Sequence, residues 1–218
     1  ANSVFSYLKT VVDSHDLSYQ KDYYNSSLDM TISGSYYYPN RFSSIGSLQP
    51  DPLAYNHNAG LLQTGLLYHK HFTDTEFLDR AQRFMDFTRA TRTYYSAEDR
   101  FEWLYRITGE GGTEDVNHGS YSFMFFNVAH ANGFLGVTST EMRRYANALL
   151  YAWKNDNTVG SCAEDFDGAG TIPTSEAFDV GAMGYMAQFN KDIAKMGRDV
   201  CSTRYIPNYL NMYRAYAS

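Results

Sequence analysis

Apolar residues recur every three or four positions over most of the chain, which is the spacing of one face of an α-helix. For example, Phe77, Ala81 and Phe84 share one face of a predicted segment. The pattern predicts seven helices. Six lie at about residues 4–12, 57–71, 117–132, 138–153, 174–189 and 207–216, and the other, third in chain order, starts after residues 73–76 and runs to about residue 91. Strand-like patterns are confined to residues 31–38 and 100–108, so we predict an all-α fold.

Two of the predicted helices begin with the same polar signal. Thr73 is followed three residues later by Glu76, and Thr138 is followed by Glu141 at the same spacing. In such a capping box the threonine hydroxyl accepts a hydrogen bond from a backbone N–H of the first turn, and the glutamate reaches back to the threonine N–H. The two pairs therefore predict the starts of the third and fifth helices.

The connections between the predicted helices are uneven. Short links follow the second and fourth helices, at about residues 72–74 and 133–137, whereas long links precede the second, fourth and sixth. The long links cover about residues 14–55, 92–116 and 154–173. The second, fourth and sixth helices also start about 60 residues apart, which indicates a repeated helix hairpin.

The two helices of each predicted hairpin differ in polarity. The second, fourth and sixth are more apolar and contain small residues such as Gly65, Ala129 and Gly184, which is typical of close packing in an inner layer. The third and fifth carry charged residues that suit an outer layer facing water. These residues are Asp79, Arg80, Arg83, Asp86, Arg89, Arg143, Arg144 and Lys154.

Stacked hairpins with inner and outer helices predict an (α/α) toroid, built as a single domain over residues 1–218. Three or four hairpins make an incomplete ring, because a full ring needs a longer chain. The long loops then open at one end of the inner helices, and loops on a rigid scaffold commonly carry functional residues. We therefore expect an open groove at that end, which suits a polymer.

Composition narrows the classes of function. Aromatic residues make up 17% of the 218 residues, and the 20 tyrosines suit wet, half-buried binding surfaces. The 18 basic and 24 acidic residues give a net charge of -6 without a basic cluster, which argues against nucleic acid as a partner. No apolar run approaches the roughly 18 residues of a membrane span, so we expect no membrane partner.

The sequence favours a secreted, extracellular protein. It starts at Ala1 without an initiator methionine, as it would after removal of a signal peptide, and it is rich in Tyr, Asn, Ser and Gly but poor in Lys. Cys162 and Cys201 form either one disulfide or two buried thiols, and their spacing does not distinguish the two.

An asparagine–histidine pair stands at the predicted start of two inner helices, as Asn56-His57 and Asn117-His118. Asparagine is a good N-cap, and this alone explains its position. The neighbouring histidine has no capping role, so the repeated pair points to chemistry. A helix start attracts anions through its N–H groups and its dipole, and Asn and His side chains there can bind and neutralise a carboxylate.

Neutralising a carboxylate is the central requirement for cleaving a uronic acid polymer by β-elimination. The C5 proton, α to the carboxylate, is weakly acidic, so its removal requires hydrogen bonds or positive charge on the developing oxyanion. A base at C5 and an acid at the glycosidic oxygen complete the chemistry. Tyr55, Tyr105 and Tyr121 lie near the two pairs, and Arg106 can hold a substrate carboxylate with its planar fork.

The stretches Trp103–Arg106 (WLYR) and Glu114–Tyr121 (EDVNHGSY) resemble (α/α)-toroid polysaccharide lyases that act on alginate or glucuronan. The resemblance covers about residues 50–190. It implies that Asn117 and either His57 or His118 neutralise the carboxylate, and that Tyr105 or Tyr121 donates or accepts a proton.

We therefore predict a polysaccharide lyase whose partner is an acidic polysaccharide, and we expect neither a metal nor another cofactor. The expected catalytic residues are His57, Tyr105, Asn117, His118 and Tyr121. The expected substrate-binding residues are Tyr55, Asn56, Trp103 and Arg106.

Two other functions fit the same scaffold. Carboxylates such as Asp115 and Asp165 can serve as the acid and base of a glycoside hydrolase. Alternatively, the tyrosine and tryptophan rings stack on sugars in a carbohydrate-binding protein without catalytic activity.

Overall fold

The computed structural model describes residues 6–7, 9–10, 19–25, 30–36, 54–106, 112–155, 161–163, 165–170, 172–173 and 185–194. The chain divides into two compact units, the first formed by residues 1–91 and 104–112 and the second by residues 92–103 and 113–218. Helices dominate the described residues and the strands are short, so the predicted mostly α-helical character is confirmed.

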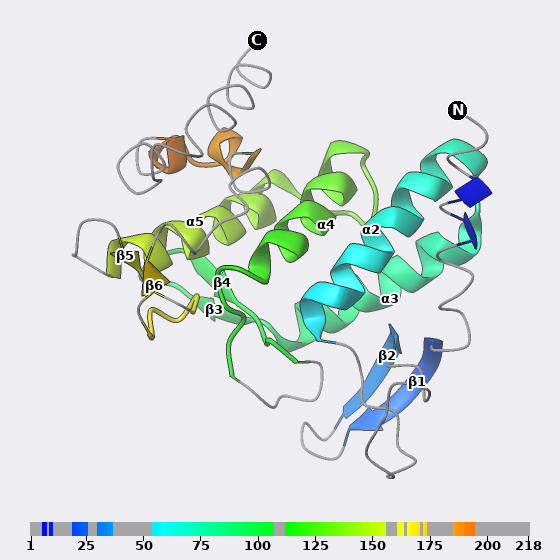
Figure 1. The fold of residues 1–218 in the computed structure, drawn as a ribbon, viewed down its shortest axis with the longest axis horizontal. Coiled ribbons are helices and arrows are strands. Elements are labelled where there is room, and N and C mark those ends of the chain that lie inside the picture. Colours follow the sequence, from blue (N-terminus) through cyan, green and yellow to red (C-terminus); the bar gives the residue numbers. More distant parts are fainter. Residues whose placement is uncertain are drawn as a thin grey trace. The chain divides into compact units, whose positions relative to one another are not determined.

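A helix hairpin forms the centre of the first unit. Helices α2 (Tyr55–Phe72) and α3 (Thr75–Thr91) are joined by two residues and lie side by side (Figure 1). Gly65 allows this close approach, because a Cβ atom at residue 65 would lie 3.2 Å from Cβ and Cγ of Phe77. Tyr68 of α2 also packs edge-on against Phe77, with 5.5 Å between the ring centroids.

The link between the two helices departs from the predicted capping box. Thr73 has a left-handed backbone with a φ of 58°, and its N–H donates to the carbonyl of His69 at 2.7 Å, which ends α2. Asp74 accepts the N–H of Glu76 on Oδ1 at 3.0 Å and so caps α3. Glu76 pairs with Arg80. The prediction of a capping box at Thr73 is therefore wrong, because Thr73 ends one helix while Asp74 caps the next.

A two-stranded antiparallel sheet packs against α3 in the same unit. Strand β1 (Tyr19–Asn25) pairs with strand β2 (Met30–Tyr36), and β2 contacts α3. Arg80 of α3 is buried, with its guanidinium 4.5 Å from the centroid of the Tyr19 ring. The sequence placed Arg80 on an outer face in water; this is wrong, because a cation–π contact and the Glu76 carboxylate hold it inside.

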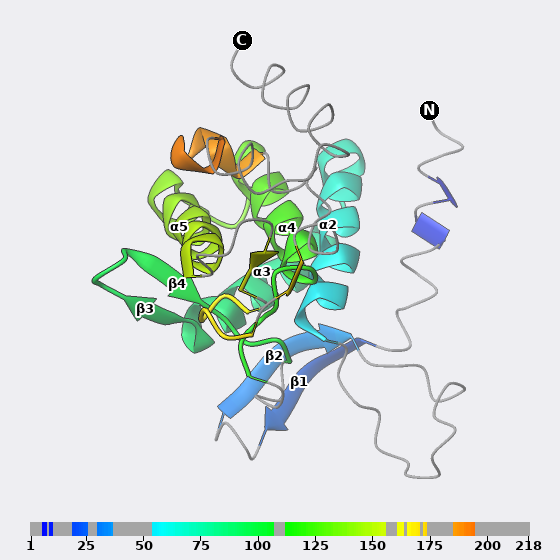
Figure 2. The ribbon, with the colours of Figure 1, turned by 60° about the vertical axis from the view of Figure 1, so that its left-hand side comes forward.

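The second unit contains its own helix hairpin. Helix α4 (Gly119–Ala131) packs against helix α5 (Ser139–Asn155), and α5 also contacts the strand hairpin of β3 (Thr93–Tyr95) and β4 (Arg100–Glu102), shown in Figure 2. The remaining elements are a second pair of strands, β5 (Ser161–Cys162) and β6 (Ile172–Pro173), and a short 3-10 helix, η3 (Tyr185–Gln188).

The start of α5 confirms the second predicted capping box. The backbone N–H of Thr138 donates to Glu141 Oε2 at 3.1 Å, and the backbone N–H of Glu141 donates to Thr138 Oγ1, also at 3.1 Å. Both donors are exposed N–H groups that the helix itself cannot satisfy. The same pattern, a threonine followed three residues later by a glutamate, therefore forms a capping box at α5 but not at α3.

Aromatic rings form the core of the second unit around Trp103, which is 1% exposed. The Trp103 ring lies 4.8 Å from Phe166, 5.4 Å from Tyr145 and 5.7 Å from Phe123, measured between ring centroids. Phe126 stacks on Tyr145 at 4.0 Å. These contacts join α4, α5 and the segments around residues 103 and 166 into one apolar cluster.

The structure confirms four predicted helices within one or two residues at most ends, namely those at α2, α3, α4 and α5. The predicted strands at 31–38 and 100–108 appear as β2 and β4, whereas β1, β3, β5 and β6 were not predicted. The helix at 207–216 lies outside the described residues. So does Cys201, and with it the choice between a disulfide and free thiols.

The other two predicted helices are described only in part. Residues 6–7 and 9–10 are helical, and residues 185–188 form the 3-10 helix η3. A third hairpin would need the segment 174–184, which is outside the described residues. Among the helices that are described, none combines the length and the apolar character needed to span a membrane.

The two capping signals can be separated by mutation. Thr138→Ala is expected to lower the free energy of unfolding by about 1 kcal/mol, because it removes one half of a formed capping box. Asp74→Ala should cost a similar amount, while Thr73→Ala should change stability by less than about 0.5 kcal/mol. Urea unfolding followed by circular dichroism measures all three. A larger loss for Thr73→Ala than for Asp74→Ala would contradict the observed cap.

Candidate active site at the start of helix α4

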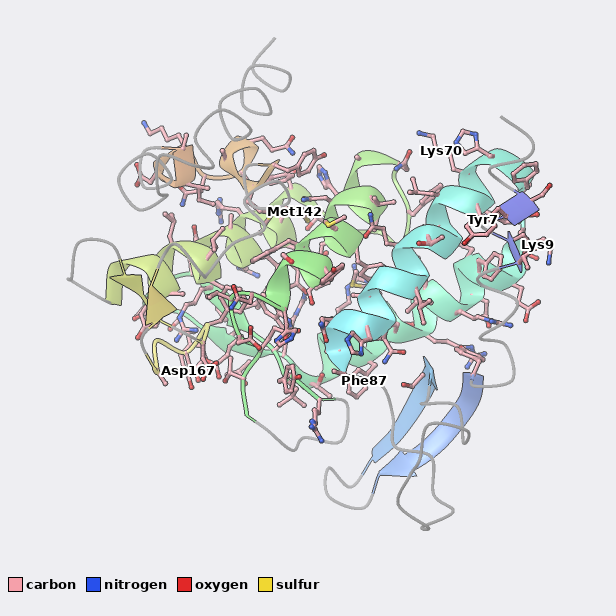
Figure 3. The ribbon with its side chains drawn as sticks, viewed as in Figure 1. Tyr7, Lys9, Lys70, Phe87, Met142 and Asp167 are labelled. Atoms are coloured by element: carbon pink, nitrogen blue, oxygen red, sulfur yellow. The ribbon has the colours of Figure 1, made fainter. Side chains whose placement is uncertain are left out.

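The segment before α4 is fixed by backbone hydrogen bonds to two other parts of the second unit. The N–H of Glu114 donates to the carbonyl of Trp103 at 2.9 Å, and the N–H of Phe166 donates to the carbonyl of Glu114 at 3.1 Å. The backbone of Asp115 pairs with that of Asp165 in an isolated antiparallel bridge. The backbone of residues 114 and 115, just before α4, is therefore fixed by the segments around residues 103 and 166. The labelled Asp167 in Figure 3 belongs to the same loop, between β5 and β6.

Asp115 caps the start of α4. Its Oδ1 accepts the backbone N–H of Asn117 at 3.0 Å and that of His118 at 2.9 Å, and its carbonyl accepts the N–H of Gly119 at 2.9 Å. The side chain of His118, which directly precedes the helix, makes no capping hydrogen bond. The capping alternative considered for Asn117 is therefore excluded, because Asp115 already satisfies these N–H groups.

The second oxygen of Asp115 contacts His118. Oδ2 of Asp115 lies in hydrogen-bond contact with Nδ1 of the His118 ring. The His118 side chain is 46% exposed, so its ring reaches solvent while one edge is held. A carboxylate at Nδ1 favours the tautomer with its proton on Nδ1, and the basic lone pair is then on Nε2. One carboxylate thus starts the helix and orients the histidine.

Glu114 is a buried acid beneath this pair. It is 0% exposed, and its Oε2 accepts the hydroxyl of Ser122 at 3.2 Å. Burial raises the pKa of Glu114 well above its ordinary value of 4.5, and the neighbouring charges of Asp115 and Asp165 raise it further. The hydrogen bond from Ser122 and the nearby indole of Trp103 lower this pKa only in part.

One oxygen of Glu114 has no hydrogen-bond partner among the described residues. Neither Glu114 Oε1 nor Trp103 Nε1 reaches full hydrogen-bond geometry, although the indole is close enough to affect the pKa of the acid. A buried polar oxygen without a partner lowers stability by about 1–3 kcal/mol. A leucine or a glutamine at position 114 would avoid the cost of burying an acid. Because the chain has a glutamate there instead, Glu114 is a candidate functional group.

Gly119 leaves space for the aromatic ring of Phe166, which packs against the start of α4. A Cβ atom at residue 119 would lie 2.4 Å from Cε2 of Phe166 and 3.6 Å from Cγ of Glu114. The Phe166 ring occupies that space and packs on Trp103. The first residue of α4 therefore has to be glycine for the aromatic floor to lie directly against the helix.

The remaining predicted residues of the second unit are Asn117, Tyr121 and Trp103. Asn117 and Tyr121 are both exposed, with Tyr121 at 49%, and the N–H of Tyr121 donates to the carbonyl of His118 at 3.2 Å. The turn that leads into α4 and the first turn of the helix thus carry an amide, an imidazole and a phenol, all open to solvent. Trp103, in contrast, is part of the buried core, and its expected contact with substrate stays a prediction.

The first unit contains the other predicted residues, at the start of α2. Tyr55 is fully buried, and its hydroxyl is in hydrogen-bond contact with Thr88 Oγ1. Asn56 is 1% exposed, with no hydrogen-bond partner for Oδ1 among the described residues. These two positions belong to the interior of the first unit, away from solvent, and their expected role in binding substrate stays a prediction. Neither one caps α2, since its N-cap is Ala54.

In the first unit, His57 and Arg106 are exposed and Tyr105 is half-buried. His57 is exposed on the first turn of α2. The N–H of Tyr55 donates to the carbonyl of Tyr105 at 2.9 Å, and Ala54 pairs with Arg106 in an antiparallel bridge. The segment 104–106 therefore runs beside the start of α2, and the exposed Arg106 lies 5.8 Å from the Tyr105 ring centroid.

Sequence reasoning missed two roles in the second unit. It treated Asp115 as a hydrolase carboxylate rather than as the cap of α4 and the partner of His118, and it gave Glu114 no role. The spacing Asp115-x-x-His118 was the available signal, because side chains three residues apart meet on one helical turn. Glu114, Asp115 and His118 also each offer a ligand atom within 4.8 Å of the others, so this cluster can hold a metal ion.

Comparison with known family models, curated proteins and solved structures returned no match for this chain. The interpretation of the site therefore depends on its own geometry.

The fit between Gly119 and Phe166 gives a direct test of the site's floor. Gly119→Ala is expected to lower the free energy of unfolding by about 1–3 kcal/mol, because the new methyl group overlaps the Phe166 ring. The double variant Gly119→Ala/Phe166→Leu should recover part of that loss, since the smaller side chain frees space. Chemical denaturation of the two single variants and the double variant measures the coupling. Strictly additive losses would contradict the contact.

Proposed function

We propose that this protein is a polysaccharide lyase that cleaves a uronic acid polymer of the alginate or glucuronan type by β-elimination. The single observation that carries the proposal is the first turn of α4, where Asp115 orients an exposed His118 between Asn117 and Tyr121. We further propose that the described hairpins belong to an incomplete (α/α) toroid, whose open groove admits the polymer.

The proposed roles follow from what each side chain can do at this helix start. His118 and Asn117 bind the substrate carboxylate and stabilise the negative charge that develops on it. Tyr121, in the first turn of the helix, transfers a proton at the sugar. The backbone N–H groups of the turn do not take part, because the Asp115 carboxylate and carbonyl already accept those of residues 117–119. Carboxylate binding therefore depends on side chains.

The reaction balances without an oxidant or a reductant. A base removes the proton from C5, and the electron pair of the C5–H bond forms a double bond between C4 and C5. The C4–O bond to the leaving sugar breaks, and the leaving oxygen takes a proton from an acid. The product carries an unsaturated uronate at its new non-reducing end, which absorbs in the ultraviolet.

The hydrolase alternative fits the same residues less well. Both oxygens of Asp115 are engaged, one by the helix turn and one by His118, and Glu114 is enclosed in the aromatic core. A hydrolase needs two carboxyl groups that flank the glycosidic bond and reach the substrate. Exposed rings on β3, Tyr94 at 46% and Tyr95 at 37%, support the other alternative, a protein that binds carbohydrate without cleaving it.

Digestion of alginate and of glucuronan, followed by ultraviolet absorbance of the unsaturated product, tests the proposal. The wild-type protein is expected to release unsaturated product from at least one uronate polymer. His118→Ala and Tyr121→Phe should each lower kcat by about 100-fold or more, because each removes a group that acts in the transition state.

Tyr94→Phe is the matched control, since it removes a phenol hydroxyl that is exposed but distant in sequence from α4. It should leave activity within about twofold of wild type. Reducing ends without ultraviolet absorbance would indicate a hydrolase, and binding without any product would indicate a carbohydrate-binding protein. Either result contradicts the lyase proposal.

A further inference from the structure

The side chains at the start of α4 form a compact set of metal-ligand atoms. One carboxylate oxygen of Glu114, one of Asp115 and a ring nitrogen of His118 all lie within 4.8 Å of one another. They come from a five-residue stretch whose backbone is fixed by hydrogen bonds to the segments at residues 103 and 166. The fold therefore fixes the backbone of Glu114, and the cap of α4 fixes the carboxylate of Asp115, beside the exposed ring of His118.

A second observation points to a ligand at the same place. Glu114 is 0% exposed, and its Oε1 has no hydrogen-bond partner among the described residues. The other oxygen of this carboxyl accepts the Ser122 hydroxyl, so Ser122 fixes the orientation of the group. The buried acid that supplies a ligand atom beside Asp115 and His118 therefore has one oxygen without a hydrogen bond of full geometry, although the Trp103 indole is near.

The surrounding charges also call for a cation. The nearby charged side chains that act most strongly on Glu114 are those of Asp115 and Asp165, and both are acidic. As metal ligands, the carboxylates of Glu114 and Asp115 would supply two negative charges, which one divalent cation balances. Buried carboxylates are stable when they are paired or when they coordinate a metal.

We propose that Glu114, Asp115 and His118 bind one divalent transition-metal cation, with Zn²⁺ as the best fit. One imidazole and two carboxylates supply three ligands, and a fourth position is left for water or substrate. An imidazole ligand favours Zn²⁺ over Ca²⁺, since Ca²⁺ prefers six to eight oxygen ligands. This proposal departs from the expectation, drawn from the sequence, that the protein needs no metal.

Binding through Nδ1 requires one small rearrangement and a change of tautomer, in which the proton of the His118 ring moves from Nδ1 to Nε2. Asp115 Oδ2 and His118 Nδ1 contact each other directly, whereas two ligands of a tetrahedral zinc ion lie about 3 Å apart. His118 is on an exposed turn, so its ring can move outward without disturbing the core. Asp115 Oδ1 keeps its bonds to the N–H groups of Asn117 and His118, so α4 keeps its cap while Oδ2 binds the metal.

The cation also deepens the proposed function, and this part depends on that proposal. A metal ion with an open position beside Asn117 and Tyr121 can bind a uronate carboxylate directly and stabilise the charge that develops on it. The cation would then offset the negative charge of the two carboxylates, which would otherwise repel an acidic polymer.

Isothermal titration of the EDTA-treated, dialysed protein with Zn²⁺ tests the site. We expect saturable binding of one ion per chain, and a 10-fold excess of Ca²⁺ should not displace it. His118→Ala and Glu114→Gln should each weaken the affinity at least 10-fold. His71→Ala is the matched control, because it removes an exposed histidine in the other unit, and it should leave the affinity unchanged.

His118→Ala decides the outcome if Glu114→Gln fails to fold, since His118 is exposed and its loss leaves the core intact; circular dichroism checks both variants. No saturable binding by the wild type, or equal affinity in wild type and His118→Ala, overturns the metal site. Binding that is lost in His118→Ala supports the site even if no uronate polymer is cleaved, a result that would contradict only the lyase proposal.

Discussion

The arrangement of the candidate site depends on the carboxylate of Asp115. One of its oxygens accepts the first N–H groups of the turn into α4, and the other contacts the ring of His118. A helix start has N–H groups that the helix cannot satisfy, and an acidic side chain there is stabilised by the helix dipole as well. The contact that begins the helix therefore also orients the histidine, and the position of His118 is set by the fold of its own turn.

The helices were predictable from the sequence because their apolar faces are long and regular, whereas single capping residues were not. Thr73 and Thr138 both precede a glutamate by three residues, yet only Thr138 forms the box. At Thr73 the link between α2 and α3 is two residues long, so this threonine has to end α2 in a left-handed conformation and cannot also start α3. The length of the link therefore decides whether a threonine three residues before a glutamate caps the next helix or ends the previous one. That length depends on the tertiary packing of both helices.

The tyrosines show why the site was harder to predict than the fold. Tyr55 and Tyr145 are fully buried and bond to Thr88 and Arg92 through their hydroxyls, while Tyr121 is half exposed. A phenol ring suits both environments, so composition alone cannot separate core from surface. Asn56 and Asn117 divide in the same way, one buried and one exposed, although both precede a histidine near a helix start. Whether such a side chain is buried depends on which face of its helix packs against the rest of the unit.

The structure of the helix start does not explain why residue 114 is an acid. Asp115 caps α4, Gly119 admits the Phe166 ring, and Trp103 fills the core; each of these roles is complete without an acid at position 114. An isosteric amide could still contact Ser122 and would not need a charge to be removed from water. Sites that break a local rule of stability are commonly the functional ones. The buried acid, placed beside a carboxylate and an oriented histidine, is therefore the feature that most strongly distinguishes this helix start from a simple cap.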